Sequence, residues 1–236
     1  MIVSIKEVKA HMQELSNPKI AEHSLRFFKT GPGEYGEGDV FLGIRVPVTR
    51  KVARKFRELS LDQILKLLKS KFHEERLLAL FMLVALFKKG DDIEKKNIYN
   101  AYLGHTDSIN NWDLVDGSAH QIVGGYLFER DRRPLYKLVK SKSLWERRIS
   151  MIATYTFIKK NDFVDTLKLS EILLPDEEDL IHKAVGWMLR EVGKLDLEVE
   201  EKFLQKHYKK MPRTMLRYAI EKFEEKKRQG YLQGTV

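Results

Sequence analysis

The sequence predicts an all-α protein, and three observations lead to this fold class. Only 6 prolines and 14 glycines interrupt the 236 residues. Between them, most segments place apolar residues at i, i+3, i+4 and i+7, the spacing of one helix face. Apolar helices also recur about every 36 residues, which is typical of helix-pair repeats of the HEAT or armadillo kind. We therefore expect one HEAT/armadillo-like helical-repeat solenoid domain, residues 1–236, whose inner helices line a concave basic groove.

Capping residues mark the expected helix starts. Asparagine followed by proline is a strong start signal, because the asparagine side chain caps the helix and proline fits its first position. Serine and aspartate act in the same way before an apolar periodic run. The expected starts are Asn17-Pro18, Ser60 before a helix at 61–70, Ser143 before one at 144–160, and Pro175-Asp176 before one at 177–194. Glycines near plausible helix ends are Gly90, Gly104 and Gly193.

The repeat has a defined register. Arg148 follows Arg76 by 72 positions, twice 36, and Lys183 follows Arg148 by 35. The position halfway between the first two holds Trp112, which begins another expected helix. These four residues should occupy equivalent places on successive inner helices. Their i+4 neighbours should then be equivalent too, and they are Leu80, Asp116, Ile152 and Trp187.

The segment at residues 30–40, TGPGEYGEGDV, breaks the helical pattern. Four glycines and one proline in eleven residues exclude a helix, so we expect a loop or a short β-hairpin. Its acids Glu34, Glu37 and Asp39 should repel phosphate at the tip. A plain surface connection is the alternative.

The composition limits the kinds of binding partner and cofactor that the chain can have. The chain has 43 Lys plus Arg against 34 Asp plus Glu, a net charge of +9, which favours a phosphate-bearing partner. It has no cysteine, which excludes disulfides, thiolate zinc sites and cysteine nucleophiles. The seven histidines have no metal-ligand spacing, so we expect no metal and no cofactor. The longest apolar run, residues 77–87, is shorter than the roughly 20 residues of a membrane span and predicts a buried helix.

The N-terminus has no apolar region of the signal-peptide type. We therefore expect a cytoplasmic, nucleoid-associated monomer that binds no membrane.

Two segments combine aromatic and charged residues at helical spacing. On a helix, Trp112 and Asp116 share a face, and Asp113 lies three positions before Asp116. The alternative is that Asp113 caps or solvates the helix start and Trp112 is a core residue. In the second segment, Trp187 and Arg190 share a face, and a glycine just before the tryptophan permits close approach by a helix or a ligand. A core tryptophan is again the alternative.

Two basic tracts lie in the second half of the chain. Residues 130–148 contain eight basic side chains against two acids, and residues 206–217 contain five basic side chains and no acid. Such tracts are often solvated faces. A basic groove with aromatic inserts also suits a nucleic-acid backbone, since Lys and Arg displace its counterions. A protein scaffold of HEAT type is a third interpretation, and the basic tracts argue against it.

Four motifs resemble the AlkD-type DNA alkylation repair proteins, which are HEAT-like solenoids of about this length. These are FLGIRVP at 41–47, WDLVD at 112–116, WERR at 145–148 and AVGWMLRE at 184–191, and the resemblance runs from about residue 18 to 220. It implies that Asp116 is the catalytic carboxylate, that Trp112 and Trp187 flank the lesion nucleotide, and that Arg148 and Arg190 contact the DNA backbone. We add Phe27 as a lesion contact and, as further DNA-binding residues, Arg147, Lys183, Arg213 and Arg217.

The chain departs from this family in two places. It inserts the glycine-rich segment before FLGI, and it has Phe27 where the family's glycosylases have tyrosine. The insertion resembles the AlkF and AlkG branch, in which a β-hairpin accompanies binding to branched DNA. Two functions follow as expectations. One is a DNA glycosylase of base excision repair that hydrolyses the N-glycosidic bond of cationic N3- or N7-alkylated purines in double-stranded DNA. The other is a non-catalytic protein that binds damaged or branched DNA through the same groove.

Overall fold

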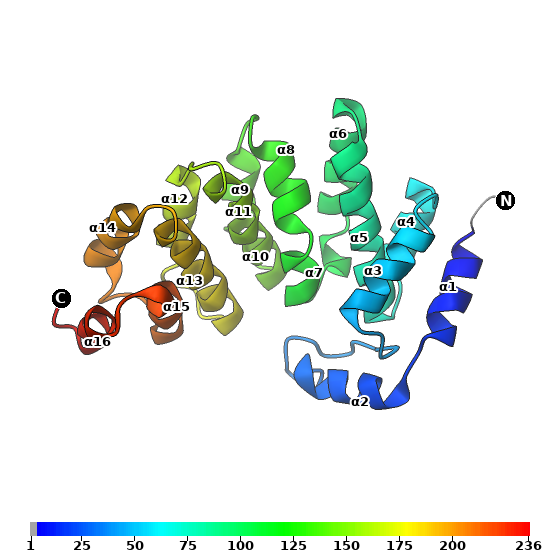
Figure 1. Cartoon of the computed structure of the whole chain (residues 1–236), viewed down its shortest axis with the longest axis horizontal. Coiled ribbons are helices and arrows are strands. Elements are labelled where there is room, and N and C mark those ends of the chain that lie inside the picture. The colour runs from blue at the N-terminus through cyan, green and yellow to red at the C-terminus, as the bar shows by residue number, and fades with distance from the viewer. Residues whose placement is uncertain (1–3) are drawn as a thin grey trace. The chain divides into compact units, whose positions relative to one another are not determined.

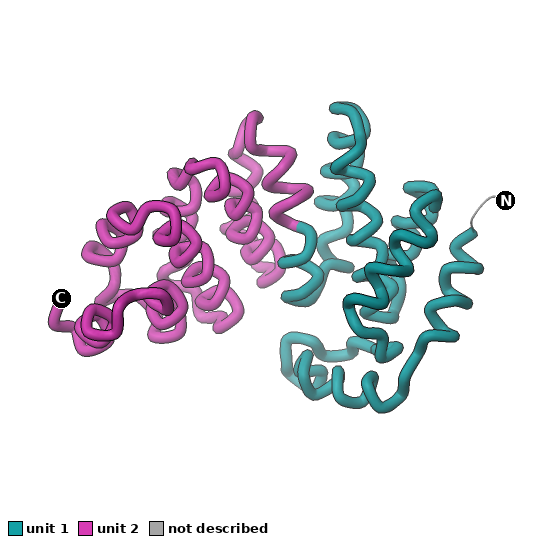
Figure 2. Tube along the Cα trace, viewed as in Figure 1, with its two compact units in different colours: residues 1–118 teal, residues 119–236 magenta. Residues whose placement is uncertain are grey.

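The computed structural model describes residues 4–236, which fold almost entirely into helices (Figure 1). Within this range there is no β-strand, and one isolated parallel bridge joins Val40 to Phe72. The all-α prediction is confirmed. The chain forms two compact units, residues 1–118 and residues 119–236 (Figure 2). The single domain and the concave basic groove stay predictions.

The first unit is built around a long apolar helix. Its described elements are α1 (Ile5–Glu14), α2 (Pro18–Phe27), α3 (Val46–Lys55), α4 (Leu61–Leu68), α5 (His73–Lys89), α6 (Asp92–Leu103), the 3-10 turn η1 (Thr106–Ser108) and α7 (Trp112–Asp116). The run predicted to be a buried helix lies in α5, where residues 77–84 are all buried. Helices α3 and α4 pack against α5 and cover its apolar side chains. Among the described residues, no helix is long and apolar enough to cross a membrane.

The second unit is organised around α13. Its elements are the π-helical turn η2 (His120–Gly124), α8 (Gly125–Leu127), α9 (Arg133–Leu138), α10 (Leu144–Ala153), α11 (Tyr155–Ile158), α12 (Val164–Ile172), α13 (Asp179–Gly193), α14 (Leu197–His207), α15 (Arg213–Ala219), the 3-10 turn η3 (Ile220–Lys222) and α16 (Glu225–Gln233). Helix α13 packs against α10, α14 and α15. A Cβ at Gly186 would lie 2.4 Å from the carbonyl oxygen of Met215 on α15. This glycine therefore serves the close approach of a neighbouring helix.

Several predicted helix starts are confirmed. The Asn17 side chain accepts hydrogen bonds from the amides of Lys19 (3.1 Å) and Ile20 (3.2 Å), and Pro18 is the first residue of α2. Ser143 caps α10 by accepting from the amide of Glu146. Ser60 precedes α4 without a side-chain cap bond. These signals are local to a few residues, which is why the sequence alone carries them.

Two predicted helices have different bounds in the structure. The helix predicted at 144–160 is interrupted, because α10 ends at Ala153 and the hydroxyl of Thr154 donates to the carbonyl of Met151. The helix predicted to follow Asp176 directly begins only at Asp179. The Asp176 carboxylate accepts from the amide of Glu178 and from Arg147, which holds residues 176–178 outside the helix. Side-chain bonds to the backbone thus displaced both boundaries.

Residues 30–39 form a loop of successive turns and no hairpin. Two of its acids bind its own backbone, since Glu34 accepts from the amide of Gly31 (2.9 Å) and Glu37 from that of Gly33 (2.8 Å). The prediction that Asp39 repels phosphate from the tip was wrong, because its side chain is only 4% exposed and pairs with residues of α5. The loop therefore folds back onto the first unit.

The predicted register holds for three of its four positions. Arg148 and Lys183 are each the fifth residue of their helices, α10 and α13, and Arg76 is the fourth residue of α5. Trp112 is the first residue of the short helix α7, so it lies about one turn earlier in its helix than the others do. Among the i+4 neighbours, Leu80 and Ile152 are fully buried, while half-buried positions are held by Asp116 and Trp187.

Candidate functional site

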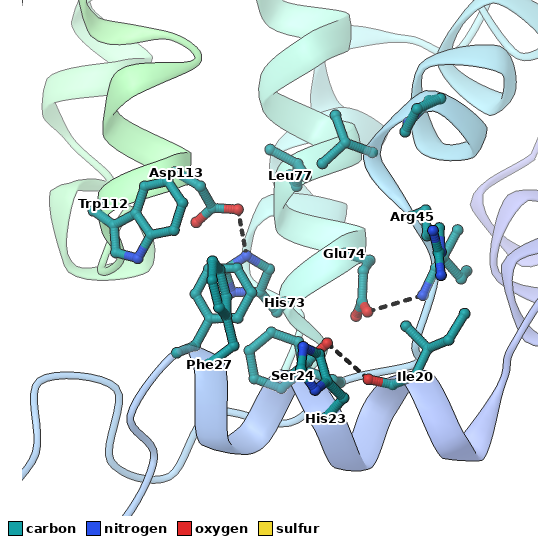
Figure 3. Close-up of a pocket in the computed structure, with 15 residues that line it drawn as sticks. Ile20, His23, Ser24, Phe27, Arg45, His73, Glu74, Leu77, Trp112 and Asp113 are labelled. Atoms are coloured by element: carbon teal, nitrogen blue, oxygen red, sulfur yellow. Dashed lines mark hydrogen bonds and ion pairs between the residues drawn. The ribbon is translucent and has the colours of Figure 1, made fainter.

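A cavity of about 830 Å³ lies in the first unit, between α2 and the starts of α5 and α7. Its walls come from α2, the segment at 41–47, the start of α5 and the start of α7 (Figure 3). Aromatic and aliphatic side chains dominate the lining, and the few charged groups are concentrated at α5 and α7. The lining residues are Ile20, His23, Ser24, Phe27, Phe28, Phe41, Ile44, Arg45, Val46, Pro47, His73, Glu74, Leu77, Trp112 and Asp113.

The structure brings two predicted lesion contacts, Phe27 and Trp112, together at this cavity. Their ring centroids are 5.9 Å apart in an edge-to-face arrangement. Phe27 is 57% exposed, which is high for a phenylalanine, whereas Trp112 is half-buried. Phe28 fills the space behind them and stacks on Trp112 at 5.5 Å and on Phe41 at 5.0 Å. The cavity thus has one exposed aromatic edge on a packed aromatic wall.

His73 lies between two carboxylates at the base of this wall. Its Nδ1 lies 2.8 Å from an oxygen of Asp39, and its Nε2 lies 2.9 Å from an oxygen of Asp113 (Figure 3 shows the second pair). Arg76 donates to the other oxygen of Asp39 at 2.8 Å. The four groups form a chain in the order Arg76, Asp39, His73, Asp113, which we call the His73 chain. It joins the 30–39 loop, α5 and α7.

The His73 chain is charged throughout. Burial favours the neutral imidazole, but the charge and hydrogen bond of Asp113, together with those of Asp39, raise the pKa of His73 to about 9. Burial likewise opposes ionisation of Asp39, and the hydrogen bond from His73 and the charge of Arg76 overcome it, which lowers the pKa of that carboxyl. At neutral pH two cations and two carboxylates therefore alternate along the chain.

Glu74 holds the backbone of the FLGI segment, residues 41–44, in place. Its two carboxylate oxygens accept the backbone amides of Leu42 (2.8 Å), Gly43 (2.8 Å) and Ile44 (3.1 Å). Gly43 has φ of +80°, and a Cβ there would lie 2.0 Å from the carbonyl oxygen of Asn17. This motif therefore fixes the start of α2 against α5 and so positions one wall of the cavity.

Asp116 lies at the end of α7 and is not among the residues that line the cavity. Asp116 is half-buried. The pKa of Tyr102 is raised mainly by the burial of that tyrosine, and the charge of Asp116 adds to the effect. Asp113, one turn earlier, faces the cavity instead. Trp112 and Asp116 lie on the same short helix, but only Trp112 lines the cavity, and the catalytic role of Asp116 stays a prediction.

In the second unit, Trp187 and Arg190 project from α13 into a polar network. The indole of Trp187 donates to Glu191 at 3.1 Å, and its ring lies 5.9 Å from that of Tyr155. Arg190 pairs with Glu221 on η3 and lies 3.6 Å from Glu191. Trp187 is half-buried rather than a core residue. Its role at a lesion stays a prediction.

The two adjacent arginines of WERR are both engaged inside the second unit. Arg147 pairs with Asp176 at 2.7 Å and donates to the carbonyls of residues 141 and 142. Arg148 is 4% exposed and donates to the carbonyl of Leu180, near the start of α13. Both guanidinium groups therefore hold helix starts together. Their contact with DNA stays a prediction.

The other predicted DNA-binding residues are closer to solvent. Lys183 pairs with Asp179 at 2.7 Å along α13, and Arg213 donates to the carbonyl of Leu232 at 2.6 Å. Arg217 is exposed on α15. Part of the first basic tract is also used internally, since Arg132 binds the carboxylates of residues 162 and 165. The basic tracts are thus partly structural and partly exposed.

Sequence reasoning missed His73, Asp39, Glu74 and Phe28 as parts of this site. The available signal was a pair of acids beside a histidine immediately before a fully apolar run, in FHEERLL. Charged groups at the start of a buried helix require partners, because burying a charge without one is costly. The identity of those partners depends on long-range packing. Among residues 4–236 there is no group of three or more His, Asp or Glu side chains arranged to hold a metal ion.

The comparisons with known proteins agree with this architecture. The sequence profile of the family described as "DNA alkylation repair enzyme" matches residues 8–223. A solved structure, described as a predicted DNA alkylation repair enzyme from Enterococcus faecalis, is similar with a TM-score of 0.68 and 16% sequence identity, over 89% of this chain and 97% of that one. At this identity the likeness concerns the fold alone. No curated protein sequence matches the chain.

Proposed function

Because the chain belongs to the DNA alkylation repair enzyme family, we propose that it is a DNA glycosylase for cationic N3- or N7-alkylated purines in double-stranded DNA. The observation that carries the proposal is the short helix α7, which presents Trp112 to an aromatic cavity and carries Asp116 one turn later. Phe27, exposed at the edge of Trp112, extends the aromatic surface, and the α7 carboxylate that lines the same cavity is that of Asp113.

The chemistry of such a lesion needs little from a protein. An N3- or N7-alkylated purine is already cationic and leaves readily, so hydrolysis passes through an oxocarbenium-like sugar with little acid assistance. The protein must supply negative charge beside C1′ and orient a water molecule. In this proposal the Asp116 carboxylate does both, and it accepts the proton of the attacking water.

Aromatic side chains suit the rest of the lesion nucleotide. A cationic base attracts the faces of nearby aromatic rings, an interaction worth about 0.5–2 kcal/mol. Phe27 and Trp112 of the first unit, and Trp187 of the second, are the side chains to which we assign this role. Phe27 is 57% exposed, and the two tryptophans are half-buried, so each of the three rings has surface available to solvent.

DNA backbone binding falls to the basic side chains of the second unit. Arg213 and Arg217, exposed on α15, are the candidates nearest to solvent, and Lys183 and Arg190 on α13 are half-buried. This proposal also assigns DNA-backbone contacts to Arg147 and Arg148, at the start of α10. Phosphate contacts of this kind position a protein on the duplex and make its affinity depend on salt.

Release of free base tests the proposal. Methylated duplex DNA is incubated with the protein, and free 7-methylguanine and 3-methyladenine are quantified by chromatography. Wild type should release base above the spontaneous rate, and Asp116→Asn should lose at least tenfold in rate. The matched control is Asp107→Asn, an exposed aspartate of η1 in the same unit, which should keep wild-type activity. No release by wild type above the spontaneous rate would refute the proposal.

A second candidate function is non-catalytic binding of branched or damaged DNA. The glycine-rich loop at 30–39 favours it, since the loop is folded and attached through Asp39 to the unit that contains the cavity. Binding to a three-way junction and to a duplex of equal length is compared at equal ionic strength. A preference for the junction that disappears when residues 31–35 are replaced by serines would support this function. Equal affinities for the two DNAs would contradict it.

A further inference from the structure

His73 has no freedom to act as an ordinary neutral histidine. It is the first residue of α5, is 1% exposed, and has a carboxylate oxygen within 3 Å of each ring nitrogen. A neutral imidazole donates one hydrogen bond and accepts one, while an ionised carboxylate only accepts. Donation from both ring nitrogens, to Asp39 and to Asp113, therefore requires the imidazolium form.

Aromatic rings hold the imidazolium in this orientation. The ring of Phe41 lies 4.7 Å from that of His73 in a stacked arrangement, and the ring of Phe28 lies 4.8 Å away, tilted. A cation against aromatic faces is stabilised, and the packed rings leave His73 no room to rotate. Phe28 is the same ring that stacks on Trp112. His73 thus contacts the helix α7 in two ways, through Asp113 and through the aromatic wall.

The charges around His73 are few and each is accounted for. Glu74 is bound by three backbone amides, Glu75 lies 3.4 Å from Lys9 of α1, and Arg76 binds Asp39. Asp113 also accepts the amide of Leu114. The remaining charged or titratable groups that share the cavity are His23 of α2 and Arg45 of the 41–47 segment. Asp39 and Asp113 are therefore the two groups that decide the protonation of His73.

The short helix α7 is held in place partly by the hydrogen bond between Asp113 and His73. It has five residues, which is too short to be stable on its own. Two hydrogen bonds hold its first residues. The Asn111 side chain accepts from the amide of Trp112, and the Asp113 carboxylate binds the ring of His73. Leu114 and Val115 are buried and hold the other face of α7, so loss of the second hydrogen bond would loosen the face that carries Trp112.

We propose that His73 is a positioning residue, which ties α7 to the 30–39 loop through Asp113 and Asp39 and thereby fixes Trp112 and Asp116 for base release. The catalytic part of this inference rests on the proposed function, whereas the positioning of Trp112 does not. The glycine-rich loop then belongs to the site, because its Asp39 maintains the charge on His73.

Nuclear magnetic resonance tests the positioning directly, with ¹⁵N-labelled wild-type protein titrated from pH 6 to 10. The His73 ring nitrogens should both carry protons at pH 7. The indole N–H resonance of Trp112 should move with the same midpoint as His73. An unprotonated ring nitrogen at pH 7, or a Trp112 resonance that does not follow His73, would overturn the proposal. This measurement needs no variant and no catalytic activity.

A variant then connects the positioning to catalysis. Asp39→Asn removes one carboxylate charge without touching the cavity, so the His73 midpoint should fall by about one pH unit or more. The alkaline limb of kcat for base release should shift by the same amount, while KM changes less than kcat. The matched control is Asp165→Asn, a carboxylate of the second unit bound to Arg132, which should shift neither. Correct folding of each variant is checked by its far-ultraviolet circular dichroism.

The outcomes separate the two proposals. If wild type releases no base but Trp112 follows His73, the glycosylase function fails and the positioning stands. If base is released and the pH profile of Asp39→Asn matches wild type despite a shifted His73 midpoint, the positioning role fails and the function stands. Should Asp39→Asn not fold, Asp113→Asn replaces it, with the same expected shift from the other side of His73.

Discussion

The phenyl ring of Phe28 stacks on the indole of Trp112 with a centroid distance of 5.5 Å and an interplanar angle of 23°. The preceding residue, Phe27, meets the same indole edge-on at 5.9 Å. Two adjacent phenylalanines at the end of α2 therefore have different tasks. Phe28 supports the indole from inside, and Phe27 extends the aromatic surface toward solvent, where it is 57% exposed.

Substitution of the two phenylalanines should separate stability from substrate binding. Phe28→Leu should lower the free energy of unfolding by about 1–2 kcal/mol, because it removes stacking on Trp112, Phe41 and His73. Phe27→Leu should change it by less than about 0.5 kcal/mol, because that ring is mostly exposed. Phe27→Leu should instead raise KM for methylated DNA. Urea unfolding and base-release kinetics measure both, and equal destabilisation by the two substitutions would contradict the assignment.

His73 should make stability depend on pH in the alkaline range. Its pKa in the folded protein, about 9, lies above the ordinary 6.5. The stabilisation is therefore complete below pH 6.5 and is lost as the pH rises through 9. Relative to His73→Gln, wild type should lose up to about 3 kcal/mol of unfolding free energy over this range. Urea denaturation at a series of pH values measures the difference. Curves that stay parallel would show that His73 is not charged in the folded state.

Glu200 should also make stability fall as the pH rises, but over a lower pH range than His73. This carboxyl is 2% exposed in α14, and burial, followed by the charge of Glu201, raises its pKa from 4.5 to about 8. The folded state therefore binds a proton that the unfolded state has lost, so stability falls as the pH rises from 4.5 to 8. Glu200→Gln should match wild type at pH 4.5 and exceed it by about 4 kcal/mol at pH 8. Thermal unfolding at the two pH values decides this, and no gain at pH 8 would contradict it.

Glu74 should be among the most sensitive positions of the first unit. Its carboxylate accepts three backbone amides, and no neutral side chain of the same shape accepts all of them. Glu74→Gln should cost about 2–4 kcal/mol and should accelerate hydrogen exchange of the amides of residues 42–44. Glu58→Gln, at an exposed glutamate of the same unit, should change stability by less than about 0.5 kcal/mol. Unchanged exchange at residues 42–44 in Glu74→Gln would refute the anchoring role.

Two arginines of the basic tracts should have separable effects. Arg217 is exposed, so Arg217→Ala should leave stability unchanged and reduce the salt dependence of DNA binding by about one counterion. Arg147 binds Asp176 and two carbonyls, so Arg147→Ala should cost about 2–4 kcal/mol of stability. Fluorescence anisotropy of a labelled duplex at several NaCl concentrations measures the slope. An unchanged slope for Arg217→Ala would remove that residue from the DNA contacts.

The features that the sequence predicted well depend on neighbouring residues. The cap at Asn17, the buried run in α5 and the helix that begins at Trp112 are set by residues within about two turns. Each has a periodic or positional signature that a single sequence retains. Phe27 and Trp112, both predicted from the sequence as lesion contacts, line the same cavity, and their contact with a lesion stays a prediction.

The features that were missed depend on residues far apart in the chain. Asp113 was interpreted as a cap, a solvated acid or a companion of Asp116, and it pairs with His73, which is 40 positions away. Asp39 was assigned to an exposed loop tip, and its partner His73 lies 34 positions away. No periodicity encodes such pairs, because each depends on which elements the fold brings together. The break after α10 was missed for a different reason, namely a threonine hydroxyl competing for a helix carbonyl.

The hydrogen bonds that attach the 30–39 loop to its flanking segments leave its tip bonded only to other loop residues. The amide of Gly36 binds the carbonyl of Lys29 at 3.0 Å, and the carbonyl of Val40 accepts the amide of His73 at 2.8 Å. Pro32 and Gly33, which lie between Lys29 and Gly36, are exposed, and nothing lies within 4 Å of a Cβ placed on Gly33. Exposed turns of this kind tolerate insertions. Extra residues can therefore be accommodated at 32–33 while Asp39 stays in place, which makes this turn a suitable point for a fluorescent or affinity label and a place where loop length can diverge in evolution.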